Sequence, residues 1–360
     1  MRLFPSPIGI IFLSLTRLFS LPPYSDAMAL ETPPTTTIVV SGACGKVGSR
    51  LLRELLNSDD GSSHIVALVR NANKLKTMME DGGHVDGEIG GFSMKEADYS
   101  NPEQLRDAFA SIPGTDSCRL FLSCGNVPDQ AQLELNVLKE AIAHTNNSLF
   151  TTKLSTATPI MEASNEEGAS AYAKEHRVVE DYLRAKCDER YCILRPNMFM
   201  QVLTAGSFLG INIPTAGENE KDGSGPMIAT HPMANCKISM IDCIDVAAVS
   251  AQILSSTNPR EQHGNKIYEL TGPSAISIGE DVASAISEEL KRPVTIDNVS
   301  LDGALESNGI PSAAGKALQP FLETLGTYQG VTPQVEQFLG RPARSIRDFV
   351  HDEKSAFVPK

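Results

Sequence analysis

The sequence predicts an α/β fold in which a doubly wound, mostly parallel sheet is followed by a smaller C-terminal region. Three observations support this fold class. Between Thr35 and Pro196, short apolar segments alternate with segments of helical periodicity. A glycine-rich turn follows the first apolar segment directly. Beyond Pro196 the alternation gives way to a stretch rich in Gly, Pro and Asn, which indicates an excursion from the sheet.

Seven segments have the composition of strands in a parallel sheet. The first, TTTIVVS, is rich in β-branched and apolar residues, as expected of a strand covered on both faces. The others share a short apolar run, and the third is the least apolar of them. The expected strands are Thr35–Ser41, His64–Val69, Met94–Tyr99, Cys118–Ser123, Leu149–Ser155, Tyr191–Leu194 and Lys266–Leu270.

Helices are expected between these strands. The sequence SRLLRELL, after the glycine turn, places its apolar residues three and four apart. Pro102 suits a first helical turn, where its missing N–H has no partner to lose. The expected helices are Val47–Leu56, one from Asn71, one after Asn101-Pro102, Gln130–His144, Ala169–Lys186, Ile244–Leu254, Ser277–Leu290, and two or three within 300–360 before a polar tail.

Composition excludes several classes of function. With 41% hydrophobic and 21% charged residues, the chain can fold around a core and is not a disordered protein. Its 31 basic and 44 acidic residues give a net charge of −13, which argues against nucleic acid or an anionic membrane as a partner. The seven cysteines include no Cys-x-x-Cys pair, so we expect buried reduced thiols and no metal site.

The strongest chemical signal is the segment SGACGKVG, residues 41–48, between the first strand and the first helix. Its glycines suit a tight turn, a close approach to a pyrophosphate and close packing of helix on strand. The N-terminus of the helix offers free N–H groups to the anion. This context predicts a dinucleotide-binding Rossmann domain. The loop residues expected at the cofactor are Gly42, Cys44, Gly45, Lys46, Val47 and Gly48.

The end of the second strand indicates which dinucleotide is bound. Enzymes that prefer NAD place an acidic residue there to accept hydrogen bonds from the ribose hydroxyls. Here the strand ends at Arg70, and Lys74 follows one helical turn later. Two cations at this spacing can hold a 2′-phosphate, so we expect NADP(H) in preference to NAD(H).

The predicted domain organisation has three parts. Residues 1–34 are a leader or extension outside the fold, residues 35–275 form the Rossmann domain with an excursion at 203–237, and residues 276–360 form a C-terminal cap region. The apolar run Ile8–Leu15 is too short to span a bilayer, so we expect no stable membrane span. We expect a cytoplasmic location, and import into an organelle or secretion through the leader stays open.

Several motifs together resemble the NmrA-like family of atypical short-chain dehydrogenases, over about residues 36–350. The segment from Leu194 to Met200, with the helix before it, is more specific than the glycine loop. The residues that carry the resemblance are the glycine loop, Ala67–Arg70, Lys153–Ser155, His176 with Glu180, Leu194–Met200, Tyr268–Pro273 and Gly340–Ser345.

The resemblance implies a Rossmann domain that binds NADP(H) and a smaller C-terminal part that caps a cleft. In that family the loop matched by Pro196 and Phe199 lies beside the nicotinamide and the substrate, so both are expected at the site. Ser155 and Thr156 lie at the end of the fifth strand, where such enzymes usually place a hydroxyl. Lys153, in the same strand, is expected either to face the cofactor or to be an edge cation.

The catalytic expectation rests on one helix. Short-chain dehydrogenases carry Tyr-x-x-x-Lys there, and the Lys lowers the pKa of the Tyr and binds the ribose. In this chain Tyr172 is followed four residues later by His176, and Lys174 points elsewhere on the helix. We name Tyr172 and His176 as the catalytic candidates, although a neutral imidazole activates a phenol less than a permanent cation does.

Two functions stay open at this point. One is an NADP(H)-dependent oxidoreductase that transfers hydride to a small quinone, carbonyl or related acceptor. The other is an NADP(H)-binding redox sensor that reports to a protein partner without turnover. Retention of Tyr172 favours the enzyme, and loss of the usual Lys favours the sensor.

Overall fold

The structure is a computed structural model. It describes residues 36–58, 62–81, 91–112, 117–125, 127–145, 148–164, 170–204, 207, 209–213, 226–307, 309, 312–326 and 328–358. The predicted leader, residues 1–34, and part of the predicted excursion therefore lie outside the described residues. No helix in the described part is long and apolar enough to cross a membrane.

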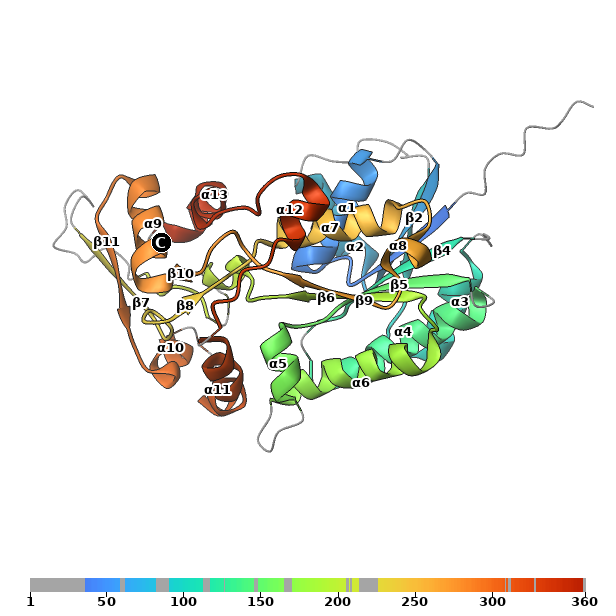
Figure 1. Cartoon of the computed structure of the whole chain (residues 1–360), viewed down its shortest axis with the longest axis horizontal. Helices are drawn as coiled ribbons and strands as arrows, with labels where there is room; N and C mark the ends of the chain where they lie inside the picture. The colour runs from blue at the N-terminus through green and yellow to red at the C-terminus, as the bar shows by residue number, and fades with distance from the viewer. Residues whose placement is uncertain are drawn as a thin grey trace, which may run out of the picture. The chain divides into compact units, whose positions relative to one another are not determined.

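A seven-stranded sheet, with every neighbouring pair parallel, forms the centre of the fold (Figure 1). The strand order reverses between β1 and β4, which is the order typical of a Rossmann fold and confirms the predicted class. From one edge to the other the strands are β3 (Phe92–Glu96), β2 (Ser63–Val69), β1 (Thr36–Ser41), β4 (Cys118–Leu122), β5 (Leu149–Leu154), β6 (Tyr191–Pro196) and β9 (Lys266–Leu270).

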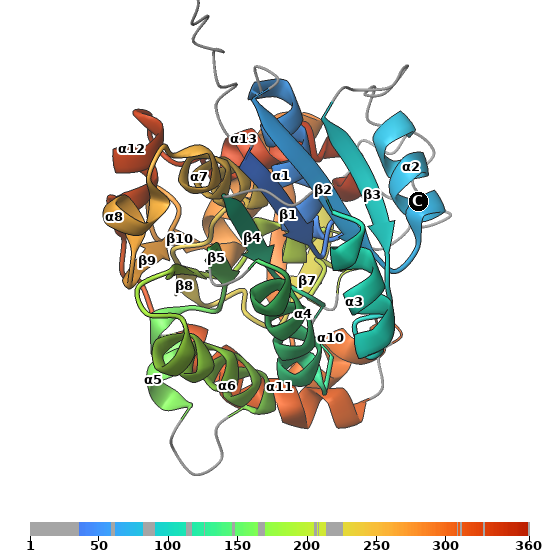
Figure 2. The ribbon, with the colours of Figure 1, turned by 90° about the vertical axis from the view of Figure 1, so that its right-hand side faces the viewer.

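Helices cover both faces of this sheet (Figure 2). One face packs against α1 (Lys46–Ser58) and α7 (Cys243–Ser255), and the other against α3 (Pro102–Ala110), α4 (Gln130–His144) and α6 (Ala171–Lys186). The other described helices are α2 (Ala72–Asp81), α5 (Thr158–Ala163), α8 (Pro259–His263), α9 (Ala283–Leu290), α10 (Leu301–Ser307), α11 (Ser312–Gly326), α12 (Gln334–Leu339) and α13 (Ile346–Asp352).

The predicted excursion and the C-terminal residues share a separate core. Strand β7 (Met227–His231) pairs with β11 (Val294–Asn298), and β8 (Lys237–Ile238) pairs with β10 (Ile276–Ser277). Apolar side chains from both segments, together with Leu322 and Phe349, form one buried cluster. The excursion is thus part of the smaller unit beside the sheet, and the division at residue 275 stays a prediction.

Three predictions differ from the structure. Within 300–360 the described residues form four helices, α10 to α13, instead of the two or three expected. The third strand lies at Phe92–Glu96 rather than Met94–Tyr99, because Asn101 caps α3 and the chain must turn before it. The helix predicted from Ser277 begins with a π-helical turn, Ile278–Val282, before α9. There the Gly279 N–H, which has no acceptor within the first helical turn, donates to the Ala234 carbonyl.

The turn between β1 and α1 is the most tightly constrained part of the sheet. Gly42 has a φ of +64°, a conformation that favours glycine. A Cβ on Gly48 would lie only 2.2 Å from the Gly42 carbonyl oxygen, so the helix can pack this close only with glycine there. Tyr99 also fixes this turn. Its phenol oxygen accepts the Gly42 N–H at 3.0 Å and donates to the Leu68 carbonyl at 2.7 Å.

We expect Gly48→Ala to lower the free energy of unfolding by about 2–3 kcal/mol, because the added methyl group meets backbone that has no rotamer to change. Denaturant titration of the parent and the variant measures the difference. Gly125→Ala is the matched control, since a Cβ there would meet no atom within 4 Å. Equal stability of the two variants would contradict the close packing of α1 on β1.

Candidate cofactor and substrate site

The predicted site residues come together at the carboxyl edge of the sheet, where the loops after β1, β4, β5 and β6 emerge. The loops after β1 and β4 touch, because a Cβ on Gly42 would lie 2.7 Å from the Ser123 carbonyl oxygen. The Ser41 hydroxyl lies 2.9 Å from that oxygen and from the Phe121 carbonyl, and it accepts the Ser123 N–H. In open α/β sheets this switch point is where ligands bind.

The N-terminal turn of α1 fits the pyrophosphate of a dinucleotide. Gly45 and Lys46 are exposed, and a Cβ on Gly45 would meet only the Gly42 carbonyl oxygen, at 3.0 Å. Backbone N–H groups at a helix N-terminus bind such an anion, and the lack of a side chain at Gly45 leaves room for it. Val47 contributes only backbone here, because its side chain is buried in the core.

Residues 42–48 form a turn that we call the glycine cradle. The Lys46 side chain turns away from this cradle. Its ammonium donates to the Gln201 carbonyl at 3.0 Å and lies 3.3 Å from the Ser207 hydroxyl. Lys46 therefore links the glycine loop to the segment that follows β6.

Two cations face the glycine loop from the end of β2. Burial raises the pKa of the Cys44 thiol, and the charges of Lys74 and Arg70 oppose that shift, so both cations lie near the loop. Both side chains are exposed, and no described residue forms an ion pair with either.

The segment after β6 is held close to the same edge. Pro196 is buried at the end of the strand, and Phe199 is half-buried between the core of the sheet and that of the smaller unit. The Asn197 amide donates to the Ser239 hydroxyl at 2.8 Å and its oxygen accepts the Met198 N–H. Phe199 thus lies between the two units, and its place beside the nicotinamide and the substrate stays a prediction.

Tyr172 lies between two rings. Its ring meets His176 edge to face at a centroid distance of 4.6 Å and meets Phe321 of α11 in the same manner at 5.4 Å. Burial raises the pKa of Tyr172 to about 12; a hydrogen bond with Thr156 opposes this rise and the charge of Glu134 adds to it. The phenol is therefore a proton donor rather than a base at neutral pH.

Lys153 requires a correction to its expected role as a cofactor contact or edge cation. Its side chain is fully buried, and its ammonium lies 2.8 Å from Glu134 of α4 and 3.3 Å from His176. It neither reaches solvent nor lies at a sheet edge, because β5 is an interior strand that α4 and α6 cover. Sequence analysis missed Glu134, whose place in the middle of a helix gives no local signal.

Ser155 also differs from its expected role. Its hydroxyl donates to Glu180 at 2.6 Å, and Glu180 is held in turn by Arg195 at 2.6 Å. This hydroxyl is buried and fastens β5 to α6, so it does not partner Tyr172. Thr156, the other hydroxyl expected at this position, lies near enough to the phenol to oppose the rise of its pKa.

The motif Gly340–Ser345 fastens the smaller unit to the sheet. Arg344 donates to Asp242 at 2.8 Å, and Arg341 lies 2.9 Å from Asp245. Both aspartates are buried at the start of α7, next to the segment after β6. These contacts set the position of the C-terminal residues relative to the site.

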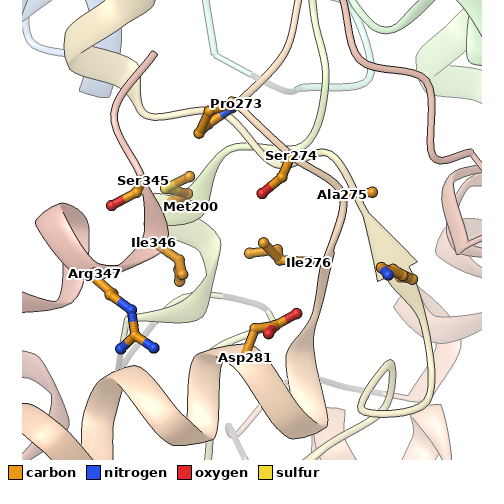
Figure 3. Close-up of a pocket in the computed structure, with 10 residues that line it drawn as sticks. Met200, Pro273, Ser274, Ala275, Ile276, Asp281, Ser345, Ile346 and Arg347 are labelled. Carbon is orange, nitrogen blue, oxygen red and sulfur yellow. The ribbon is translucent and has the colours of Figure 1, made fainter. Parts of the chain in front are cut away.

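A cavity of about 340 Å³ lies within the smaller unit (Figure 3). Asp281 and Arg347 lie at one end of it, and Pro273 and Ser274 lie at the other. Met200, directly after Phe199, lines this cavity, whereas none of the glycine-loop residues does. The cavity is thus separate from the cofactor cradle.

Comparisons with known proteins agree with this geometry. A sequence model of the NAD(P)H-binding family matches residues 42–257, more than half of the chain. The NAD(P)H azoreductase of Xenophilus azovorans is 26% identical over 326 residues, which cover 89% of this chain and 99% of that protein.

Two solved structures share the fold. The triphenylmethane reductase of Citrobacter sp., complexed with NADP(H), aligns with a TM-score of 0.63 at 18% identity, over 89% of this chain and 99% of that one. The NADPH-dependent quinone oxidoreductase of Escherichia coli aligns with a TM-score of 0.60 at 22% identity, over 88% of this chain and 98% of that one.

The family match begins at Gly42, in the turn whose glycines form the cradle, and extends to the end of α7. The resemblance to the NmrA-like family is confirmed, as is NAD(P)H as the cofactor. The chain belongs to the NAD(P)H-binding family.

Proposed function

We propose that this protein is an NADP(H)-dependent reductase that transfers hydride to a small, oxidised acceptor such as a quinone, an azo compound or a carbonyl. When bound, NADPH supplies the hydride. The glycine cradle binds the pyrophosphate, and the segment from Pro196 to Phe199 positions the acceptor. The azo and quinone acceptors of the relatives support this substrate class.

The observation that carries the proposal is the placement of Tyr172. Its phenol ring packs between His176 and Phe321, and burial keeps the phenol protonated at neutral pH. A protonated phenol beside a bound acceptor can give that acceptor a proton, which suits the reduction of a carbonyl or related group. The aromatic and thioether side chains nearby suit a flat, apolar acceptor.

The choice of NADP(H) over NAD(H) rests on Arg70 and Lys74. Both face the glycine loop from the end of β2 and are free of ion pairs with described residues. A guanidinium binds a phosphate through two parallel N–H groups, and a ribose hydroxyl offers no comparable charge.

A redox sensor is the second candidate, favoured by one contact. Lys46 belongs to the loop expected to bind the pyrophosphate, yet its ammonium is bonded to Gln201 and Ser207. A phosphate that draws this ammonium away would release the segment after β6, which a protein partner can detect.

We expect the protein to oxidise NADPH when quinones, azo dyes or aldehydes are supplied, at a rate above the same mixture without protein. Loss of NADPH absorbance measures this rate. Tight NADP(H) binding without turnover across the whole panel would favour the sensor instead.

Arg70→Ala is expected to weaken NADPH binding by about 1–3 kcal/mol and to leave NADH binding nearly unchanged, because only NADPH carries the 2′-phosphate. Titration calorimetry with both cofactors measures the two affinities. Arg106→Ala, at another exposed arginine on α3, serves as the control. An equal loss for both cofactors would remove Arg70 from the selection of NADP(H).

Tyr172→Phe is expected to lower kcat for an aldehyde by roughly 10²–10⁴-fold and to leave the NADPH dissociation constant unchanged, since the phenol supplies a proton and does not hold the cofactor. Tyr182→Phe on the same helix is the control. If the variant reduces a quinone as fast as the parent does, solvent supplies those protons and the phenol is needed only for carbonyl acceptors. Parent-like reduction of the aldehyde would exclude Tyr172 as the donor.

A further inference from the structure

A buried polar cluster lies next to the Tyr172–His176 ring pair. It belongs neither to the glycine cradle nor to the residues proposed to position the acceptor. It consists of Gln130 and Glu134 on α4, Lys153 on β5 and His176 on α6. All four side chains are buried, and Lys153 and Glu134 have essentially no exposed surface. Burial of an ion pair costs free energy unless its remaining hydrogen bonds are satisfied, so each bond of this pair matters.

The Lys153 ammonium has three N–H donors and three acceptors. It donates to Glu134 Oε1 at 3.0 Å, to the Leu154 carbonyl, and to His176 Nδ1 at 3.3 Å. Glu134 in turn accepts the Cys124 N–H at 3.2 Å and lies 3.4 Å from the Gln130 amide. The pair therefore joins the loop after β4, strand β5 and helix α6 at one point.

The contact with Lys153 determines which ring nitrogen of His176 carries the proton. An ammonium carries donors and no acceptor, so Nδ1 must be the unprotonated nitrogen and the proton of a neutral imidazole lies on Nε2. The Gln130 amide nitrogen lies 3.3 Å from Nδ1 and 3.2 Å from Nε2, so it does not distinguish the two ring nitrogens, and the assignment rests on the Lys153 contact. Burial, together with the Lys153 charge, also lowers the pKa of His176 well below its usual value.

His176 is the member of the cluster whose ring contacts the ring of Tyr172. The two residues are one helical turn apart, and their rings meet edge to face at 84°. In the usual Tyr-x-x-x-Lys arrangement a lysine at the second position would place its charge beside the phenol. Here the ammonium comes from β5, lies behind the imidazole, and is balanced by the Glu134 carboxylate.

We propose that Lys153, paired with Glu134, is a positioning residue for Tyr172: it fixes His176 as a neutral imidazole protonated on Nε2, against which the phenol ring packs. The cluster thereby takes over the orienting role of the missing helix lysine without its charge, and Tyr172 stays protonated. The effect of Lys153 on turnover rests on the proposed reductase function, whereas the state of the imidazole does not.

The direct test is the protonation state of His176 by NMR of protein labelled with ¹⁵N-histidine, with the signal assigned by comparison with His176→Gln. The proposal expects an Nε2–H tautomer in the parent at pH 7, and conversion to imidazolium only at a pH well below the usual histidine pKa. An Nδ1–H tautomer or an imidazolium at pH 7 would overturn it. This measurement needs neither acceptor nor turnover.

The second test replaces both partners, because removal of one would leave an unpaired buried charge. In Lys153→Met with Glu134→Gln, the new amide oxygen at 134 can still accept the Cys124 N–H. The groups facing His176 are then Gln130, the new side chains at 134 and 153, and Tyr172. With the ammonium gone, we expect a mixture of His176 tautomers and a higher His176 pKa; an unchanged Nε2–H tautomer would overturn the proposal.

Kinetics separate positioning from a general loss of structure. In the double variant we expect kcat for an aldehyde to fall about tenfold, the loss typical of one hydrogen bond, with the NADPH dissociation constant unchanged. Lys139→Met, the same change at an exposed lysine on α4, should leave both values as in the parent. A double variant with parent kcat, while Tyr172→Phe is impaired, would also overturn the proposal.

The outcomes distinguish this proposal from the proposed function. If the parent protein reduces no acceptor, the proposed reductase function is wrong. The NMR measurement would still decide which nitrogen of His176 carries the proton. A parent that turns over, but carries the other tautomer, would keep the reductase and remove Lys153 from the positioning of Tyr172.

Discussion

The close contact between Gly48 and the Gly42 carbonyl is the constraint on which the site depends. It seats α1 against β1 so tightly that no side chain fits between them, and it aims the N-terminus of the helix across the carboxyl edge of the sheet. Ser41 and Tyr99 then tie this turn to β4 and β2. The cradle is thus set by the backbone before any cofactor is present.

Charged pairs hold the other loops of that edge. Glu134 with Lys153 joins the loop after β4 to β5, Glu180 with Arg195 joins α6 to β6, and Asp242 with Arg344 joins α7 to the C-terminal unit. In each pair at most about 1% of the carboxylate side chain is exposed. Removal of one partner would therefore leave a buried charge unpaired. Such pairs favour a rigid site, in which hydride transfer depends on how well donor and acceptor are placed.

The site differs from that of an ordinary short-chain dehydrogenase in its charge. The phenol of Tyr172 has rings on two sides and His176 in place of the usual lysine one helical turn later, and burial raises its pKa. The phenol is therefore protonated at neutral pH and available as a proton donor to an acceptor that receives hydride. The family relationship and the chemistry of the site therefore agree on reduction.

Local patterns in the sequence determined the alternating strands and helices, the glycine turn, the cations at the end of β2, and the shared helix face of Tyr172 and His176. Each of these depends on residues a few positions apart, which is the range over which periodicity and turn chemistry act. Only the tertiary structure decided that Lys153 is buried against Glu134, that Ser155 bonds to Glu180, and that Tyr99 holds the glycine turn. Those partners are 19, 25 and 57 residues apart, and they meet because the sheet order brings distant strands and helices together.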